Sequence, residues 1–254
     1  MKLFDLEGRV AIVTGGNGGI GLGMAKGMAA AGAAVVVAGR NAKKNAAAVT
    51  ELEGQGGKAA AVEVDVTDEA SCRAMCEQAA KRFGRLDILV NNAGMSIRKQ
   101  PEAFTLGEWK QVIDTNLNAA FACAQAAYPH MMKAGGGKII NIGSMLSIFG
   151  TAYAAPYAAS KGGIVQMTKA LASAWAKDNI QANAILPDWI DTDLTRAARQ
   201  QVQGLHERVL VRTPAGRWGA PDDFAGIAVF LASPASDFIT GAAITVDGGY
   251  SVQG

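Results

Sequence analysis

Cysteine and histidine are scarce in this chain of 254 residues, and each scarcity excludes a class of protein. The three cysteines, Cys72, Cys76 and Cys123, are odd in number and lack the spacing of a disulfide framework, which is typical of a reducing compartment. We interpret Cys72 and Cys76, four residues apart, as small helix residues rather than as a metal or redox pair. The two histidines, His130 and His206, lie far apart in the sequence, so we expect no zinc site.

Long apolar runs and excess charge are also missing. No stretch approaches the roughly 18 apolar residues that a membrane-spanning helix needs, and the first residues lack the cationic start and apolar run of a signal peptide. The formal net charge of +2 gives no strong field for a polyanion. We therefore expect a soluble, cytoplasmic protein that binds neither nucleic acid nor membrane.

Short apolar runs alternate with longer helix-like segments from one end of the chain to the other. The runs are rich in valine and isoleucine and too short for helices, whereas segments such as 20–31 and 68–83 have helical length and composition. Alternation of this kind requires long crossovers, and long crossovers make parallel sheets. The sequence predicts a single doubly wound α/β domain of the Rossmann type over residues 1–254, with a seven-stranded parallel sheet. The expected strands are 9–13, 34–39, 59–64, 86–90, 138–143, 180–186 and 242–248.

A glycine-rich loop, TGGNGGIGLG at residues 14–23, follows the first expected strand and precedes a helical pattern. Glycine allows a tight turn and a close approach to phosphate, and a helix N-terminus offers unpaired N–H groups. The spacing Gly16-x-Gly18-x-x-Gly21 fits the general dinucleotide fingerprint. Its place between a strand and a helix favours dinucleotide binding over a plain tight turn.

The same loop, read as Thr14-Gly15-x-x-x-Gly19-x-Gly21, resembles the signature of the short-chain dehydrogenase/reductase family. The resemblance extends through Asn91-Asn92-Ala93-Gly94 to Tyr157-x-x-x-Lys161, in the order that the family has. It implies hydride transfer between a nicotinamide coenzyme and a secondary alcohol or ketone. It also implies a set of coenzyme-binding residues: Gly15, Asn17, Gly19, Ile20, Gly21, Asn41, Asp65, Val66, Asn92, Ala93, Gly94, Tyr157, Lys161, Pro187, Ile190 and Thr192.

Arg40, at the end of the second expected strand, bears on the choice of coenzyme. An acidic residue about 20 positions after the glycines normally binds the ribose 2′-hydroxyl of NAD, but no Asp or Glu occurs between residues 22 and 50. A guanidinium attracts a 2′-phosphate and can donate two hydrogen bonds to it. Arg40 therefore favours NADP, with Lys43 and Lys44 as possible helpers, although an arginine stacked on adenine would also tolerate NAD.

Pro156 decides which of two nearby tyrosines is the catalytic candidate. Proline is tolerated in the first helical turn and disfavours helix for the residue before it. We expect a helix from about 156 to 178, with Tyr157 and Lys161 one turn apart on one face and Tyr153 on the preceding loop. A nearby ammonium would lower the pKa of a phenol toward neutrality, so Lys161 would activate Tyr157 as a proton donor.

The resemblance supplies two further catalytic residues. Ser144 lies 13 positions before Tyr157 and would hold the substrate oxygen. Asn116 would hold a water that relays protons from Lys161. Ser147 and Asn118 are the weaker alternatives for these two roles.

Residues 186–195, LPDWIDTDLT, depart from the family at one position. Pro187, Ile190 and Thr192 match the family's Pro-Gly-x-Val/Ile-x-Thr segment, but Asp188 replaces the glycine. Because aspartate tolerates positive φ less well than glycine, the local backbone is in question, and a charge beside the pocket is an alternative consequence. We favour the interpretation that the replacement is an ordinary benign substitution.

Residues 193–216 are expected to form a lid over the substrate, with a basic bias that would attract carboxylates. The basic residues are Arg196, Arg199, His206 and Arg212, and the expected pocket residues are Ser96, Ile97, Ser144, Met145, Leu146, Tyr153, Tyr157 and Trp189. Within the family the sequence is most similar to 2-deoxygluconate and gluconate dehydrogenases, so a sugar, sugar acid or hydroxy acid is the expected substrate. The resemblance further implies a homotetramer. The alternatives are a non-catalytic nucleotide-sensing protein and a 3-oxoacyl carrier-protein reductase-like enzyme.

Overall fold

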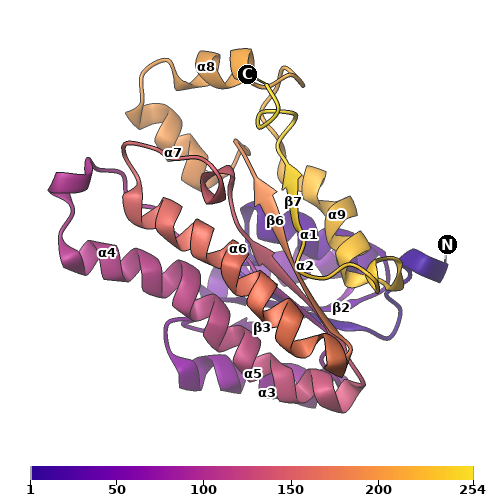
Figure 1. Ribbon diagram of the computed structural model, residues 1–254. Coiled ribbons are helices and arrows are strands. Elements are labelled where there is room, and N and C mark those ends of the chain that lie inside the picture. The colour runs from indigo at the N-terminus through magenta and orange to yellow at the C-terminus, as the bar shows by residue number, and fades with distance from the viewer. Residues whose placement is uncertain (1, 254) are drawn as a thin grey trace.

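The computed structural model describes residues 2–253 and contains one seven-stranded sheet (Figure 1). The strand order is β3-β2-β1-β4-β5-β6-β7, and every neighbouring pair is parallel. This arrangement confirms the predicted fold class, and each expected strand overlaps an observed one. The strands are β1 Val10–Thr14, β2 Ala34–Gly39, β3 Lys58–Glu63, β4 Ile88–Asn91, β5 Gly137–Ile142, β6 Ile180–Pro187 and β7 Ala243–Val246.

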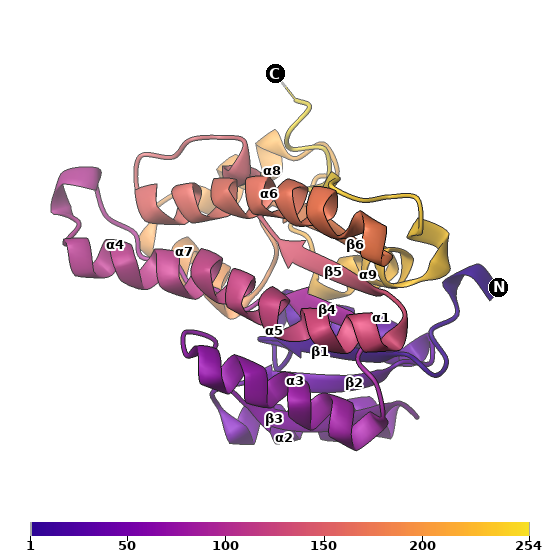
Figure 2. The same ribbon diagram turned by 60° about the horizontal axis from the view of Figure 1, so that its bottom comes forward.

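Helices cover both faces of the sheet, which explains why the central strands are apolar along their whole length. α1, α2 and α9 pack on one face, and α3, α5 and α6 on the other (Figure 2). The three cysteines belong to the second layer, where Cys72 of α3 contacts Cys123 of α5 with 3.5 Å between the sulfurs. All three are buried free thiols. The helices are α1 Gly19–Ala30, α2 Ala42–Gly54, α3 Glu69–Phe83, α4 Leu106–Ile113, α5 Ala119–Ala134, α6 Ala155–Trp175, α7 Asp193–Gln201, α8 Leu205–Arg212 and α9 Ala225–Ala232.

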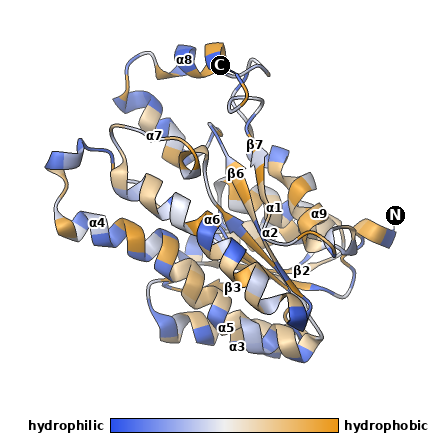
Figure 3. Ribbon diagram, in the orientation of Figure 1, coloured by the Kyte–Doolittle hydropathy of each residue, from blue (hydrophilic) through white to orange (hydrophobic). Residues whose placement is uncertain are grey.

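The outer helices show the expected division between water and core. Along α4, hydrophilic residues alternate with hydrophobic ones (Figure 3); Val112 is fully buried, whereas Leu106 is 69% exposed. Within residues 2–253 no helix has both the length and the apolar character that crossing a bilayer requires.

Two local features place the residues that matter for function. A π-helical segment, Asp114–Asn118, joins α4 to α5 and turns Asn116 inward, where it is 2% exposed. α6 starts at Ala155 with Pro156 in its first turn, so Tyr157 and Lys161 are helical and Tyr153 precedes the helix. α7 and α8 lie beyond the carboxyl end of β6 (Figure 1), over the edge where ligands of such sheets bind.

The packing of α1 depends on glycines that face the C-terminal part of the chain. A Cβ atom on Gly23 would lie 2.1 Å from the Pro221 carbonyl oxygen, whereas a Cβ atom on Gly226 would meet nothing within 4 Å. We predict that Gly23→Ala lowers the free energy of unfolding by about 1–3 kcal/mol through overpacking. Gly226→Ala, inside α9, should leave stability unchanged or raise it by up to about 1 kcal/mol. Denaturant unfolding checks both, and equal stability of the two variants would contradict the packing argument.

Candidate active site

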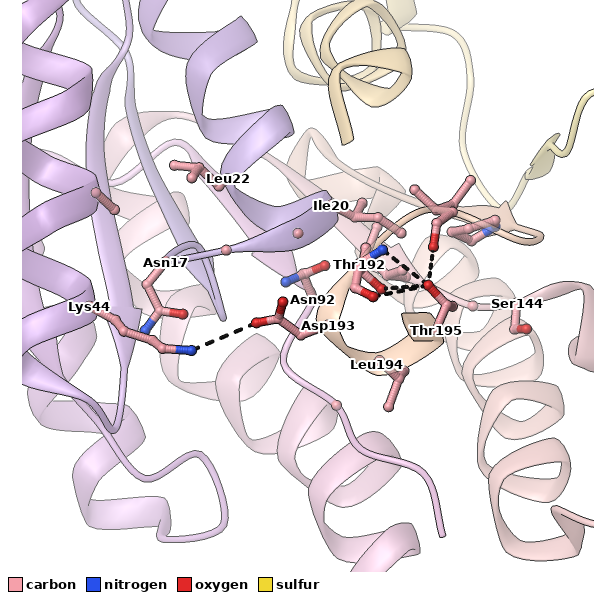
Figure 4. Close-up of a pocket in the computed structure, with 18 of the residues that line it drawn as sticks. Asn17, Ile20, Leu22, Lys44, Asn92, Ser144, Thr192, Asp193, Leu194 and Thr195 are labelled. Carbon is pink, nitrogen blue, oxygen red and sulfur yellow. Dashed lines mark hydrogen bonds and ion pairs between the residues drawn. The ribbon is translucent and has the colours of Figure 1, made fainter. Parts of the chain in front are cut away.

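Two adjoining cavities lie at the carboxyl edge of the sheet. One, of about 480 Å³, runs from the glycine loop past α6 to the segment after β6 (Figure 4). The other, of about 310 Å³, lies between the loop after β5, α6 and the two helices α7 and α8. Ser144, Tyr157, Asp188, Leu194 and Thr195 line both cavities. Groups on this shared wall can act on a molecule in either cavity.

The glycine loop provides an anion-binding surface for the larger cavity. α1 begins at Gly19 with no side-chain cap, so its first N–H groups remain available to a phosphate. Gly19 has φ of +51°, a conformation that favours glycine. Asn17, Gly19 and Ile20 line this cavity as predicted, but Gly21 does not. A Cβ atom on Gly21 would lie 2.4 Å from both Asn92 Nδ2 and the Gly15 oxygen, so its role here is close packing.

Asn92 and Thr14 tie the glycine loop to the end of β4. The Asn92 side chain donates hydrogen bonds to the carbonyl oxygens of Thr14 and Gly15, at 3.0 and 3.1 Å. The buried Thr14 hydroxyl accepts from the backbone N–H groups of Asn92 and Ala93. Asn92 and Gly94 also line the larger cavity. These bonds fix the glycine loop to the end of β4.

A further cavity of about 320 Å³ continues from the glycine loop to the ends of β2 and β3. Its lining includes the predicted residues Gly15, Arg40, Asn41, Asp65, Val66 and Ala93. Hydrogen bonds from Thr67, together with the Arg40 charge, hold the pKa of Asp65 below its ordinary value. Lys44 lines this cavity and the larger one, whereas Lys43 lines neither. Lys44 Nζ lies 3.8 Å from an oxygen of Asp193 (Figure 4), which places a cation and an anion across the cavity.

The segment after β6 closes the other side of the larger cavity. Pro187, Ile190 and Thr192 line it, as the resemblance implies. The Thr195 hydroxyl donates to the Ile190 carbonyl oxygen and accepts from the Thr192 N–H at 3.0 Å (Figure 4). These bonds fold the segment into a compact turn at the start of α7. Asp188 has no positive φ, so the backbone accommodates the replacement of glycine here.

Ser144, Tyr157 and Lys161 converge on the larger cavity from β5 and α6. The Ser144 hydroxyl caps the short helix that follows, accepting from the Leu146 N–H at 3.1 Å. Lys161 is 4% exposed, and its Nζ donates to the Ile142 carbonyl oxygen at 2.6 Å. The Lys161 ammonium also lies 5.6 Å from the centre of the Tyr157 ring. The predicted trio is therefore assembled in one place.

The protonation of Tyr157 differs from the sequence-based expectation. Burial raises the pKa of Tyr157 above its ordinary value, while the Ser144 hydroxyl and the Arg98 guanidinium oppose the shift. Lys161 is not among the groups that lower the pKa of Tyr157. Its ammonium is hydrogen-bonded to the Ile142 carbonyl oxygen, and burial lowers its own pKa to about 8. The phenol is thus fully protonated at neutral pH. This protonated form is the one that can donate a proton.

Asn116 lies beside this trio without lining the cavities. Its amide oxygen accepts from the Met95 N–H at 2.8 Å, and its amide nitrogen donates to Met95 O and Ser160 Oγ at 2.9 and 3.1 Å. The side chain therefore joins the loop after β4 to α6. The two alternative residues, Ser147 and Asn118, form other hydrogen bonds. Ser147 donates to the Lys161 carbonyl oxygen at 2.7 Å, and the exposed Asn118 donates to Asp114.

The smaller cavity contains most of the predicted substrate residues. Ser96, Met145, Leu146, Tyr153 and Trp189 line it, whereas Ile97 lines only an outer, more open cavity. Of the four basic residues named for the lid, Arg212 alone lines the smaller cavity. The other three have partners outside this cavity lining: Arg196 and Arg199 pair with Asp191, and His206 stacks on Trp218.

Two arginines that no sequence motif singled out, Arg98 and Arg208, also line this cavity. Arg98 follows the Asn-Asn-Ala-Gly motif, and Arg208 lies four residues before Arg212 on α8. The sequence shows that both residues are arginines. It does not show which arginines face the cavity, because that depends on how α8 packs over the loop after β4.

The fold and the site together define a nicotinamide-dependent oxidoreductase of the Rossmann class. A family model described as enoyl-(acyl carrier protein) reductase matches residues 15–251. The chain belongs to the short-chain dehydrogenase/reductase family, as the sequence motifs predicted.

The chain is similar over nearly its whole length to three proteins of this family. The chain is 41% identical over 251 residues to the 2-dehydro-3-deoxy-D-gluconate 5-dehydrogenase of Escherichia coli (strain K12), covering 98% of each chain. It is 40% identical over 251 residues to the gluconate 5-dehydrogenase of Gluconobacter oxydans (strain 621H), covering 99% of this chain and 98% of that one. Its structure is similar to the crystal structure of a gluconate 5-dehydrogenase from Burkholderia cenocepacia J2315 in complex with NADP and tartrate. The TM-score is 0.94 at 42% identity, covering 99% of this chain and 98% of that one.

Tyr157 and Tyr153 provide a matched test of the site. We predict that Tyr157→Phe lowers kcat by at least ~100-fold, the usual scale for a positioned acid/base group. Coenzyme affinity should be retained, since the ring remains in place. Tyr153→Phe, which removes a hydroxyl from a side chain that is 54% exposed, should stay within about threefold of the parent. Steady-state kinetics checks both, and near-normal activity of Tyr157→Phe would exclude the proton-donor role.

Proposed function

We propose that the protein is an NADP(H)-dependent oxidoreductase that interconverts a keto group and a secondary alcohol on a sugar acid. One observation carries the substrate class: Arg98, Arg208 and Arg212 line the cavity that Ser144 and Tyr157 share with the coenzyme side. The names of the E. coli and G. oxydans relatives, which act on gluconate derivatives at carbon 5, support the same class.

The three arginines suit a carboxylate. A guanidinium can donate two parallel hydrogen bonds to a carboxylate, and it does so more strongly where water is excluded. Burial lowers the pKa of Arg98, and within residues 2–253 Arg98 forms no ion pair. A half-buried cation without an anionic partner is stabilised when an anionic ligand arrives. A neutral substrate would leave that charge uncompensated.

The catalytic chemistry then follows from three side chains. When bound, the nicotinamide coenzyme supplies the hydride for reduction and accepts it in oxidation. In the reductive direction Ser144 would hold the carbonyl oxygen by its hydroxyl. Tyr157 would donate its proton to that oxygen as the alcohol forms. Lys161 would restore the phenol, and the buried Asn116 would fix the backbone around Met95 on the proton path.

The coenzyme residues fit NADP. The uncapped start of α1 suits the pyrophosphate, and Pro187, Ile190 and Thr192 suit the carboxamide end. At the opposite end Arg40 and Lys44 present two cations beside Asn41, which suits a 2′-phosphate. The Burkholderia cenocepacia relative was solved with NADP, which supports the preference. NAD remains a coenzyme that the same residues can hold.

The proposal also includes a substrate lid, an oligomeric state and a cellular location. Residues 193–216 would act as the substrate lid, since α7 and α8 border the cavity and contribute Leu194, Arg208 and Arg212 to its lining. A homotetramer is supported by apolar side chains exposed on α4 and α5, including Leu106 and Phe121 at 69% and 47%. The three unpaired thiols support a cytoplasmic location.

Arg40 and Lys43 allow a test of the coenzyme preference with equal changes in charge. We predict that Arg40→Asp shifts the ratio of kcat/KM for NADP over NAD toward NAD by at least about tenfold, because a carboxylate repels the 2′-phosphate and accepts from the ribose hydroxyl. Lys43→Asp, on a residue outside the cavities, should change the ratio much less. Equal effects of the two variants would remove Arg40 as the discriminator.

The substrate class is tested by comparing a keto sugar acid with neutral and acyl substrates. NADPH oxidation should be at least about 100-fold more efficient with 5-keto-D-gluconate than with the neutral ketose fructose or a 3-oxoacyl thioester, since loss of a paired charge costs this much. Arg98→Gln should raise KM for the keto acid by at least about tenfold. Arg196→Gln, in the lid outside the cavity, should not.

The same panel separates the alternative functions. Preference for the thioester would favour a carrier-protein reductase, and turnover of none of the substrates would favour a nucleotide sensor. Equal KM changes for the two arginine variants would contradict the assignment of Arg98.

A further inference from the structure

Asp188 places a carboxyl group where the two cavities meet. It follows the last residue of β6, Pro187, and lines the larger cavity with Ser144, Tyr157 and Lys161. It also lines the smaller cavity that holds the arginines. The position is glycine in the family pattern, so the carboxyl group is a feature of this chain rather than of the fold. Its φ is not positive, so the backbone here does not depend on glycine.

The surroundings keep this carboxyl group poised between its two protonation states. Burial raises the pKa of Asp188 to about 7, and the like charge of Asp247 adds to the shift. The backbone N–H of Trp189 and the guanidinium of Arg212 oppose it. The Arg212 guanidinium also stacks over the Tyr250 ring, with 4.2 Å between its central carbon and the ring centre. Within residues 2–253 Asp188 forms no ion pair.

A charge at this place matters because of what the coenzyme changes during the reaction. Hydride transfer requires the reacting carbons to be in contact. The nicotinamide end therefore belongs in the cavity that Ser144 and Tyr157 line. The oxidised ring carries a positive charge, and the reduced ring is neutral. A carboxylate on the wall of that cavity stabilises the oxidised ring and has little effect on the reduced one.

We propose that Asp188 discriminates between the two oxidation states of the coenzyme, strengthening the binding of NADP⁺ relative to NADPH when its carboxyl group is ionised. The inference rests on the proposed coenzyme, and it does not depend on the identity of the substrate. In each reductive turnover the hydride passes to the carbonyl carbon, a proton from Tyr157 reaches the oxygen, and NADP⁺ remains. Ionised Asp188 would stabilise that product and favour reduction in the bound state.

The discrimination should depend on pH in a defined direction. Below about pH 6 Asp188 is mostly protonated and the preference disappears; above about pH 8 it is ionised and the preference is complete. Lys161, with a pKa of about 8, shares the cavity and loses its positive charge over part of the same range, which would also favour NADP⁺. Tyr157 stays neutral over this range, because its pKa lies above the ordinary value. A variant of Asp188 is therefore needed to separate its share from that of Lys161.

The test is equilibrium binding of NADPH and NADP⁺ to the full chain at pH 5.8 and pH 8.5. The measured quantity is the ratio of Kd for NADPH to Kd for NADP⁺, obtained by fluorescence and calorimetric titration. Titration of the coenzyme's own phosphate cancels in this ratio, because both forms carry it. At pH 8.5 the ratio for the parent should exceed that for Asp188→Asn by about tenfold, the scale of one partly screened charge pair. At pH 5.8 the two ratios should agree.

Two further variants guard the interpretation. Asp188→Gly, the family residue, should behave as Asp188→Asn does, which shows that the effect is electrostatic and not a property of the amide. Asp191→Asn removes a carboxylate that precedes α7, pairs with Arg196 and Arg199, and lines neither cavity, so it should keep the ratio of the parent.

The outcomes are distinct. Equal ratios for the parent and Asp188→Asn at pH 8.5, with both coenzyme forms binding, would overturn the role of Asp188 and leave the proposed function intact. Failure of the parent to bind either form would overturn the coenzyme proposal and this inference with it.

Discussion

One helical turn, from Tyr157 to the buried Lys161, holds the rest of the site in register. Its residues bond to three separate parts of the chain: Lys161 to the end of β5, Ser160 to Asn116 of the π-helical segment, and the Lys161 carbonyl to Ser147. α6 itself is anchored by Ile164 and Leu171, which are 1% and 6% exposed. Displacement of this turn would break all three links, so the reacting groups are positioned by the core and not by a flexible loop.

Desolvation shifts the pKa values of the two ionisable groups of that turn in opposite directions. It favours the neutral phenol of Tyr157 and the neutral amine of Lys161, because a low-dielectric environment penalises either charged form. Near pH 8 the phenol is neutral, whereas Lys161, with a pKa of about 8, is divided between its charged and neutral forms. A protonated phenol is the form that reduction of a ketone requires. The sequence-based expectation, drawn from one Coulomb interaction, omitted the desolvation that outweighs it here.

The fold was predictable because its determinants are local and periodic. Valine-rich runs such as Ala34–Gly39 gave the strands, and Pro156 gave the start of α6 within a residue. Motif spacing also brought Ser144, Tyr157 and Lys161 together correctly. Which arginines face the cavity could not be predicted from the sequence. Arg196 and Arg208 are the same residue type and differ only in how α7 and α8 pack. Gly21 shows the same limit: a motif identifies a glycine without saying whether a ligand or a neighbouring Asn92 requires it.

The site is electrostatically asymmetric, and this asymmetry connects the two cavities. Arginines line the side away from the glycine loop, the cations Arg40 and Lys44 lie at the opposite end, and the carboxyl group of Asp188 lies on the wall that the two main cavities share. An anionic substrate and an anionic phosphate are each met by opposite charge, while the pyridinium formed during reduction would lie beside a carboxylate. The Arg212 guanidinium opposes the rise in the pKa of Asp188, and on the proposed function the same guanidinium would also contact the substrate carboxylate. Substrate recognition and coenzyme discrimination would then be coupled through one side chain, because binding of a substrate carboxylate to Arg212 would weaken its interaction with Asp188.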